Sequence, residues 1–106
     1  MKKKNAKNWS LQPQEQEGSY SFSGKMFMTS GIQFELDLLE ISNIISTIKD
    51  KVQKEVGLDY LQVFKKQNSK RKIFVIDNLN KEMKQNKDQE FLNSNDYFTI
   101  MFAEEY

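Results

Sequence analysis

Residues 37–57 read DLLEISNIISTIKDKVQKEVG, and this amphipathic segment decides the fold. Its apolar residues recur every three or four positions, which is the period of a helix with one buried face. Asp37 suits a helix N-cap, and Glu40 stands three residues later, as in a capping box. Gly57 follows the last apolar position, where many helices end in a left-handed residue. We therefore predict a helix of ~20 residues and ~30 Å. Its apolar stripe is Leu38, Ile41, Ile45, Ile48, Val52 and Val56, widened by Leu39 and Ile44.

Shorter segments on both sides of this helix have the composition of β-strands. Residues 19–28 alternate between two faces and are rich in aromatics, which indicates a strand. Residues 59–65 and 72–77 are β-rich and are joined by a loop that suits a hairpin. Residues 97–103 are apolar on both faces, which is typical of an interior strand.

The remaining segments show weaker patterns. Residues 29–31 read as a turn. Residues 79–95 are polar, with a short helical turn indicated near Leu79 and Met83, and residues 93–96 read as a loop. Residues 1–18, basic and then rich in glutamine, are predicted to form a flexible tail.

The order of these elements predicts an α+β fold. The chain of 106 residues fits one domain, which we place at residues 19–106. We expect an antiparallel sheet of about four strands, with one long amphipathic helix packed on one face. The second face of such a sheet would be left uncovered, so a homodimer is an open alternative.

The absence of two residue types limits the chemistry of this protein. The sequence contains no cysteine and no histidine. It therefore lacks disulfides, thiolate or imidazole metal ligands, and the side chains of Ser-His-Asp or Cys-His catalysis. We predict a protein without catalytic residues, metal site or cofactor.

Nothing in the sequence predicts export or membrane insertion. The basic start, residues 1–4, is followed by no apolar run of the kind found in signal peptides. No stretch approaches the ~20 apolar residues that a membrane span needs. We therefore expect a cytoplasmic protein that makes no membrane contact.

The acidic residues permit two interpretations. Glu35, Asp37 and Glu40 lie near the start of the helix, where paired carboxylates could act as acid and base or hold Mg²⁺. Acids at a helix N-terminus also cap free N–H groups and offset the helix dipole. We favour the capping interpretation, and we interpret Glu104 and Glu105 as solvated charges.

Basic residues are concentrated in two places. The first is the tail, and the second is the predicted hairpin with Lys65, Lys66, Lys70, Arg71 and Lys72. These five residues can contact phosphates or a protein, but lysines near a hairpin turn also keep a protein soluble and block edge pairing. The sequence pI of 7.8 is lower than the ~9 usual for dedicated nucleic-acid binders.

Aromatic residues on the predicted strands also have two interpretations. Exposed rings can stack on bases, but a thin domain needs most of them in its core, which is the interpretation we favour. Trp9 lies outside every periodic segment. We therefore assign it, with the five basic residues of the hairpin, to partner binding.

Four segments resemble a known family. They are Thr29–Ile32 (TSGI), Asp59–Phe64 (DYLQVF), Lys72–Asp77 (KIFVID) and Met101–Tyr106 (MFAEEY). In this order they resemble the small firmicute "domain of unknown function 960" proteins, many of which are encoded by phages and other mobile elements. The resemblance covers roughly residues 26–106. It implies a small accessory protein and assigns no catalytic residue.

These observations together predict a non-enzymatic protein-binding module. The resemblance extends this expectation to a phage- or mobile-element-encoded regulator or inhibitor of a host enzyme, for example an anti-CRISPR-type inhibitor. The alternative is a nucleic-acid-binding accessory protein that uses the basic residues of the hairpin.

Overall fold

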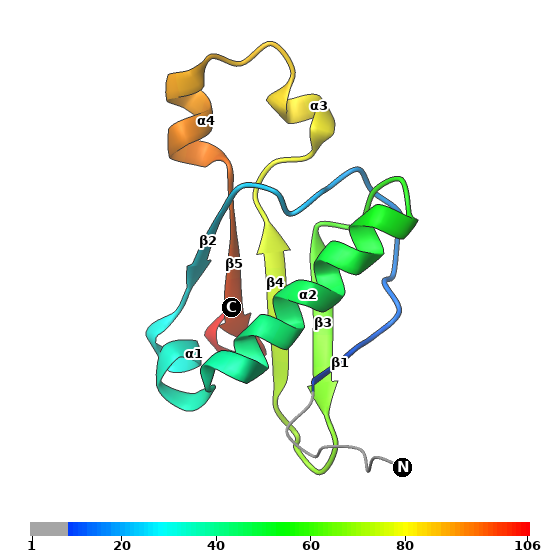
Figure 1. Ribbon diagram of the computed structural model, residues 1–106, viewed down its shortest axis with the longest axis vertical. Helices are drawn as coiled ribbons and strands as arrows, with labels where there is room; N and C mark the ends of the chain where they lie inside the picture. The colour runs from blue at the N-terminus through cyan, green and yellow to red at the C-terminus, as the bar shows by residue number, and fades with distance from the viewer. Residues whose placement is uncertain (1–8) are drawn as a thin grey trace.

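A five-stranded sheet forms the centre of the molecule in the computed structural model, which describes residues 9–106 (Figure 1). The strand order is β1-β3-β4-β5-β2. All neighbouring strands are antiparallel except β2 and β5, which are parallel. The strands are β1 (Trp9–Leu11), β2 (Lys25–Met28), β3 (Leu61–Lys66), β4 (Lys72–Asp77) and β5 (Tyr97–Phe102).

The predicted α+β class is confirmed, with a correction to the sheet. It is mixed and has five strands, where an antiparallel sheet of about four was expected. The chain passes from β2 through two helices before it returns to the sheet, and this long crossover lets β2 lie parallel to β5. β5 is an interior strand, as predicted.

The long helix α2 (Leu38–Lys54) lies across one face of the sheet (Figure 1). Its predicted capping box is present: Glu40 N–H donates to Asp37 Oδ1 at 2.8 Å, and Asp37 N–H donates to Glu40 Oε1 at 3.1 Å. The buried residues Ile41, Ile44 and Ile48 come from the middle of the helix, where it lies over the strands. Leu38, the first residue of α2, and Val56, two residues beyond its C-terminal end, were both predicted to be core. Both are exposed.

The core lies between α2 and the sheet. Every second residue of the three inner strands points towards the helix, which is the alternation expected when one face of a sheet is buried. The largest fully buried side chains there include Phe64, Ile73, Ile100 and Phe102. No helix within residues 9–106 is both long and apolar enough to cross a membrane.

The N-terminal boundary of the domain differs from the prediction. Trp9–Leu11 pairs with β3 as an edge strand, and Trp9 is buried in the core. Gln14 Oε1 then accepts hydrogen bonds from Asp59 N–H and Gln62 Nε2, both at 3.0 Å. The predicted tail is therefore corrected for residues 9–18, which pack on the domain, while its first eight residues lie outside the described part.

Of the three short helices within residues 9–106, α3 (Lys81–Lys84) contains Met83 and agrees with the short helical turn predicted near Leu79 and Met83. The other two were not expected: α1 (Ser30–Glu35) occupies the predicted turn, and α4 (Gln89–Asn95) lies in the polar stretch before β5. The loop predicted at residues 93–96 is thus largely helical. A 3-10 turn, η1 (Ala103–Glu105), follows β5.

The strand predicted at residues 19–28 is much shorter than expected. Only Lys25–Met28 joins the sheet, and Tyr20 forms an isolated bridge with Leu58. Between them Phe22 adopts a φ of 52°, which interrupts extended backbone. The C-terminal end of α2 also differs, because no glycine within residues 9–106 has a positive φ, so Gly57 is not the left-handed residue that was predicted.

Candidate binding surfaces

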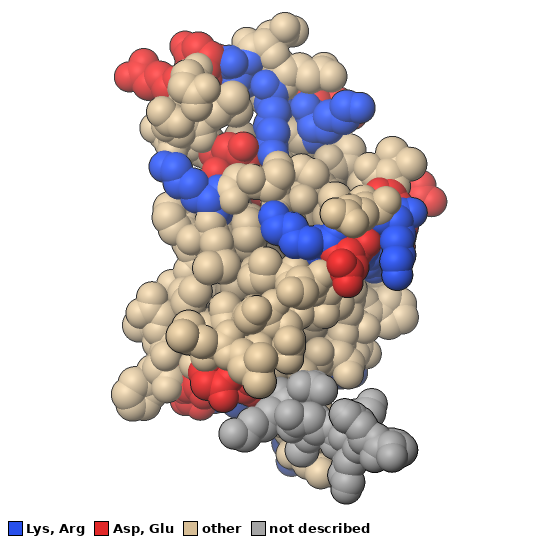
Figure 2. All heavy atoms as spheres, in the orientation of Figure 1, with Lys and Arg blue, Asp and Glu red and all other residues tan. Residues whose placement is uncertain are grey.

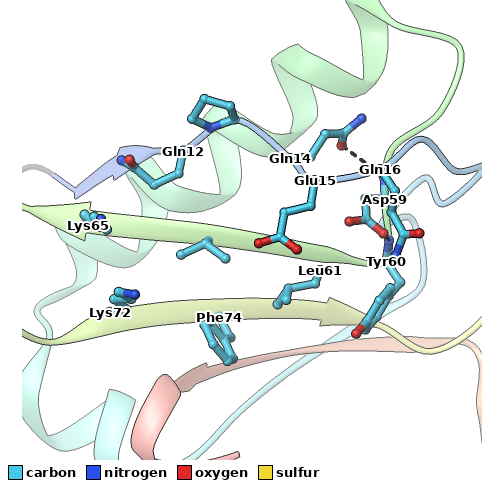
Figure 3. A pocket seen from close by; sticks show the side chains of 12 residues that line it. Gln12, Gln14, Glu15, Gln16, Asp59, Tyr60, Leu61, Lys65, Lys72 and Phe74 are labelled. Atoms are coloured by element: carbon cyan, nitrogen blue, oxygen red, sulfur yellow. Dashed lines mark hydrogen bonds between the residues drawn. The ribbon is translucent and has the colours of Figure 1, made fainter.

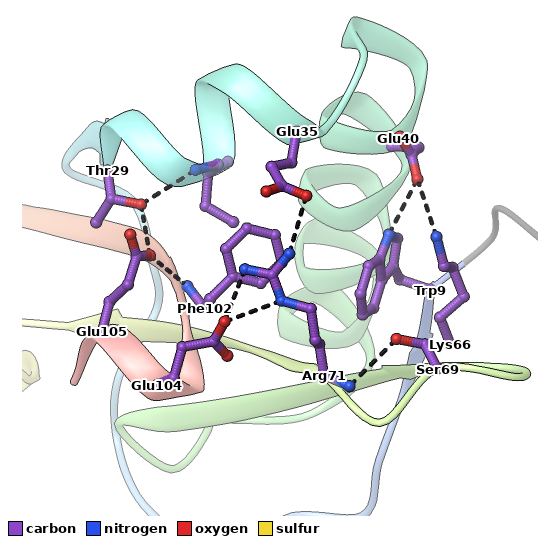
Figure 4. Close-up of polar contacts among 11 residues, drawn as sticks. Trp9, Thr29, Glu35, Glu40, Lys66, Ser69, Arg71, Phe102, Glu104 and Glu105 are labelled. Carbon is purple, nitrogen blue, oxygen red and sulfur yellow. Dashed lines mark hydrogen bonds and ion pairs between the residues drawn. The ribbon is translucent and has the colours of Figure 1, made fainter.

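The basic residues of the β3–β4 hairpin are divided between the two faces of the sheet. Lys65 and Lys72 are directly opposite in register and point away from α2 (Figure 3). Lys66 and Arg71 lie on the helix side, where both make contacts within the chain (Figure 4). Lys70 is exposed near the turn. The five residues therefore do not form the single surface that the sequence suggested.

Trp9 belongs to a contact that fastens β1 to α2. Its indole Nε1 donates to Glu40 Oε2 at 3.1 Å. Lys66 Nζ lies 4.0 Å from the same oxygen and 5.0 Å from the centroid of the Trp9 ring. Trp9, which we expected to meet a partner, is thus occupied within the fold.

Arg71 connects the hairpin to α1 and to the C-terminal segment (Figure 4). Its Nη1 donates to Glu35 Oε1 at 2.9 Å, and its Nη2 lies 2.7 Å from Glu104 Oε2. The guanidinium carbon lies 3.6 Å from the centroid of the Phe102 ring, a cation–π contact. The hydrogen bond to Glu104 is the main reason that the pKa of Arg71 is raised. Arg71 therefore holds three segments of the chain together.

Glu105 fixes the start of α1. Its Oε1 accepts from Thr29 Oγ1 and from Phe102 N–H, both at 2.8 Å. Thr29 Oγ1 in turn caps α1 by accepting from Ile32 N–H at 3.2 Å. The expectation that Glu104 and Glu105 are merely solvated is corrected, because both glutamates bond to distant parts of the fold.

The acids near the helix start are also occupied. Glu35 pairs with Arg71, and Asp37 and Glu40 form the capping box. Within residues 9–106, no three acidic side chains are grouped closely enough to hold a metal ion. The observed bonds agree with the capping interpretation for Asp37 and Glu40, whereas Glu35 is the last residue of α1 and bonds to Arg71.

The face of the sheet opposite α2 carries a regular set of side chains, which we call the open sheet face. The register aligns them in rows across the strands, with Val63, Phe74 and Met101 in one row and Leu61, Ile76, Thr99 and Phe27 in the next. Its strand residues are Ser10, Lys25, Phe27, Leu61, Val63, Lys65, Lys72, Phe74, Ile76, Tyr97, Thr99 and Met101.

Two aromatic pairs and a groove shape the surface of the open sheet face. Phe27 packs on Tyr97 with ring centroids 5.0 Å apart, and Phe74 packs on Tyr106 at 5.8 Å. A groove of about 320 Å³ runs along β3 and β4 (Figure 3). The pKa of Tyr60, at one end of this groove, is raised mainly by electrostatic interaction with Tyr106 and secondly by burial. Its lining includes residues 12–16, 59–61, Val63, Lys65, Lys72 and Phe74.

A second surface lies at the junction of α1 and α2. Phe34, Leu38 and Leu39 are 89%, 83% and 65% exposed, and we call these three residues the apolar patch. Figure 2 shows that the face over α1 and the first half of α2 is mostly uncharged, with acidic side chains at its lower edge. Sequence reasoning missed this patch, because it assigned both leucines to the core and did not predict α1. Two adjacent leucines in a first turn were the available signal, since one helix stripe rarely buries both.

Comparison with known proteins adds no relative. No protein-family model matches the chain, and neither a curated protein nor a solved structure matches it. The resemblance to the "domain of unknown function 960" proteins therefore stays a prediction that rests on the four quoted segments.

Proposed function

We propose that this chain is a non-enzymatic protein-binding module whose apolar patch enters a pocket on a partner protein. The observation that carries the proposal is the exposure of Phe34, Leu38 and Leu39 within residues 34–39. Burying one large apolar side chain contributes ~1.5–3 kcal/mol. Clustered exposed apolar residues on a small domain are typical of interaction sites.

The patch stands on a rigid base, which favours binding. Thr29 and Glu105 hold the start of α1, and Arg71 bonds to Glu35 at its last turn. The capping box then fixes the first turn of α2. Side chains that are held in place before binding lose less conformational entropy when a partner orders them.

The surroundings of the patch indicate the chemistry of its partner. The next three exposed residues along α2 are Ser42, Asn43 and Ser46, which carry no charge. Two exposed acids, Glu35 and the cap residue Asp37, lie next to the patch in the sequence. A complementary partner would present an apolar pocket with a neutral or weakly basic rim. Regulation or inhibition of a host enzyme, such as a CRISPR effector, is the specific form of this proposal, and it rests on the family resemblance.

The proposal is tested with a matched pair of variants. L38S/L39S removes two exposed apolar side chains of the patch, whereas V56S removes one that is fully exposed beyond the other end of α2. Proteins captured from host lysate by the wild type and V56S but lost with L38S/L39S are purified and titrated by calorimetry. We expect L38S/L39S to weaken the direct interaction by about tenfold or more.

Two results would contradict the proposal. One is a purified partner that binds L38S/L39S as tightly as V56S. The other is a concentration-dependent dimer in sedimentation that L38S/L39S disperses, because the patch would then bind a second copy of this chain.

A further inference from the structure

We propose that the open sheet face is a binding site for single-stranded nucleic acid, separate from the apolar patch. The strands present aromatic and aliphatic side chains there, bordered by Lys25, Lys65 and Lys72. Among the described strand residues of this face none is acidic. A surface that combines aromatic rings for stacking with charges that are all positive matches the chemistry of an unpaired polynucleotide.

Lys65 and Lys72 form an uncompensated pair of charges. They are directly opposite each other in the β3–β4 register, and both are exposed. Like charges in this arrangement destabilise a sheet. Within residues 9–106 neither makes an ion pair, whereas the other side of the same hairpin pairs Lys66 and Arg71 with glutamates. A phosphate between Lys65 and Lys72 would relieve their repulsion.

The rings lie between this lysine pair and Lys25. Phe74 is two residues beyond Lys72 on β4, and Tyr97 is paired in register with Lys25. The rows of Lys72 and Lys25 are separated by about six residues along the strands, or ~20 Å at ~3.3 Å per residue. An extended strand of a few nucleotides can span this distance, with phosphates at both ends and bases on Phe74 and on the Phe27–Tyr97 pair.

The surrounding acids indicate the path of the strand. Glu15 reaches over β3 at the edge of the groove (Figure 3). Its carboxylate would repel phosphates there, which directs the polynucleotide across β4, β5 and β2. Asp59, at the end of the same groove, is buried and accepts from Tyr60 N–H at 2.8 Å.

A second copy of the chain is a poorer occupant of this face. Two copies packed sheet against sheet would bury six lysines, since each copy contributes Lys25, Lys65 and Lys72, against only the two Glu15 carboxylates at the groove edges. Burying charges of one sign without partners is costly. The charge of the face therefore favours a polyanion over self-association.

The test is fluorescence anisotropy of a labelled single-stranded oligothymidylate of about 12 nucleotides, titrated with the full chain at low salt. We expect K65Q/K72Q to weaken binding about tenfold or more and to reduce the salt slope by about 1.4, the contribution of two phosphates. F74L, which keeps an apolar side chain but removes the ring, should weaken binding about fivefold or more. K54Q/K81Q removes two exposed lysines outside this face and should leave affinity nearly unchanged.

Each variant is first checked for wild-type circular dichroism and thermal melting. No binding by the wild type at low salt, or equal binding by K65Q/K72Q and K54Q/K81Q, would overturn the proposal. So would affinity for duplex DNA or heparin that equals the single-strand affinity and is unaffected by F74L, because this would reflect attraction of any polyanion. L38S/L39S should retain oligonucleotide binding, so the two proposals can fail independently.

Discussion

The carboxylate of Asp77 accepts a hydrogen bond from the backbone N–H of Phe22 at 2.9 Å, across 55 positions of sequence. Lys49 Nζ donates to the carbonyl oxygen of the same residue at 3.0 Å. Phe22 is thereby held from both sides in its left-handed conformation, with its ring against Phe98 in the core. These contacts explain why the predicted strand at residues 19–28 is interrupted.

The first prediction concerns the acceptor at Asp77. D77A would leave the buried N–H of Phe22 without a partner, which costs ~1–3 kcal/mol in the free energy of unfolding. D77N keeps an oxygen in the same place and should retain most of the stability. Urea denaturation at neutral pH measures both, and equal destabilisation by the two substitutions would contradict the assigned role of the hydrogen bond.

The second prediction is a pH dependence that arises from the same residue. Asp77 is only 2% exposed, and burial raises its pKa above the usual 3.8, opposed by the Phe22 hydrogen bond and by Lys84. Between 3.8 and the raised value the folded state binds more protons than the unfolded state, so the contribution of Asp77 to stability increases as pH falls through this range. The unfolding free energy of the wild type should therefore rise relative to that of D77N on acidification. A constant difference from neutral pH to about pH 4 would show that Asp77 does not titrate in this way.

The third prediction is that Arg71 stabilises α1. Its ion pairs are about half exposed, so R71A should lower the unfolding free energy by only ~1 kcal/mol. The larger effect should be local, because α1 loses the ion pair between Glu35 and Arg71. Hydrogen exchange should become faster at Leu36 N–H, which bonds to Ile32 O, but not within β4. K70A, which removes a neighbouring exposed lysine, is the control and should change neither measurement.

The fourth prediction tests whether the chain from Trp9 onward belongs to the domain. W9A removes a buried ring and its bond to Glu40, and should destabilise the fold by about 3 kcal/mol. W9F keeps most of the ring and should cost less. Circular dichroism melts compare the three proteins, because W9A and W9F lack the single tryptophan needed for fluorescence. Wild-type stability of W9A would show that β1 is not fastened to the core.

The sequence predicted those parts of the fold that depend on neighbouring residues. Asp37 and Glu40 define the start of α2 within one turn, and the spacing of Ile41 and Ile48 identifies its buried face. The start of α1 depends instead on Glu105, which lies 76 positions from Thr29. No local pattern encodes such a contact, so α1 was predicted to be a turn.

The candidate surfaces were predictable only in part. Successive side chains of a strand point to opposite faces of the sheet, which already places Lys65 and Lys66 on different faces. The division of the basic residues between the two faces therefore follows from the sequence. The adjacent leucines Leu38 and Leu39 already indicated that one helix stripe would not bury both. That both are exposed depends on where the strands end beneath α2, which no local pattern encodes. An uncovered second face of the sheet was expected from the sequence, since a single long helix covers only one face.

The fifth prediction separates two roles for Gly57. If this residue were a left-handed helix cap, asparagine would be tolerated better than alanine, because asparagine adopts that conformation more readily. The structure instead gives Gly57 an ordinary φ and brings the backbone of Gly18 and Ser19 so close that an added Cβ would lie 2.7 Å from Gly18 O and 2.8 Å from Ser19 Cα. Both contacts are with backbone, which cannot move aside cheaply, so G57A should destabilise by ~1–3 kcal/mol. G57N should be no better than G57A in chemical denaturation, since its larger side chain meets the same atoms. Higher stability of G57N than of G57A would contradict the close approach of residues 18–19 and restore the capping role.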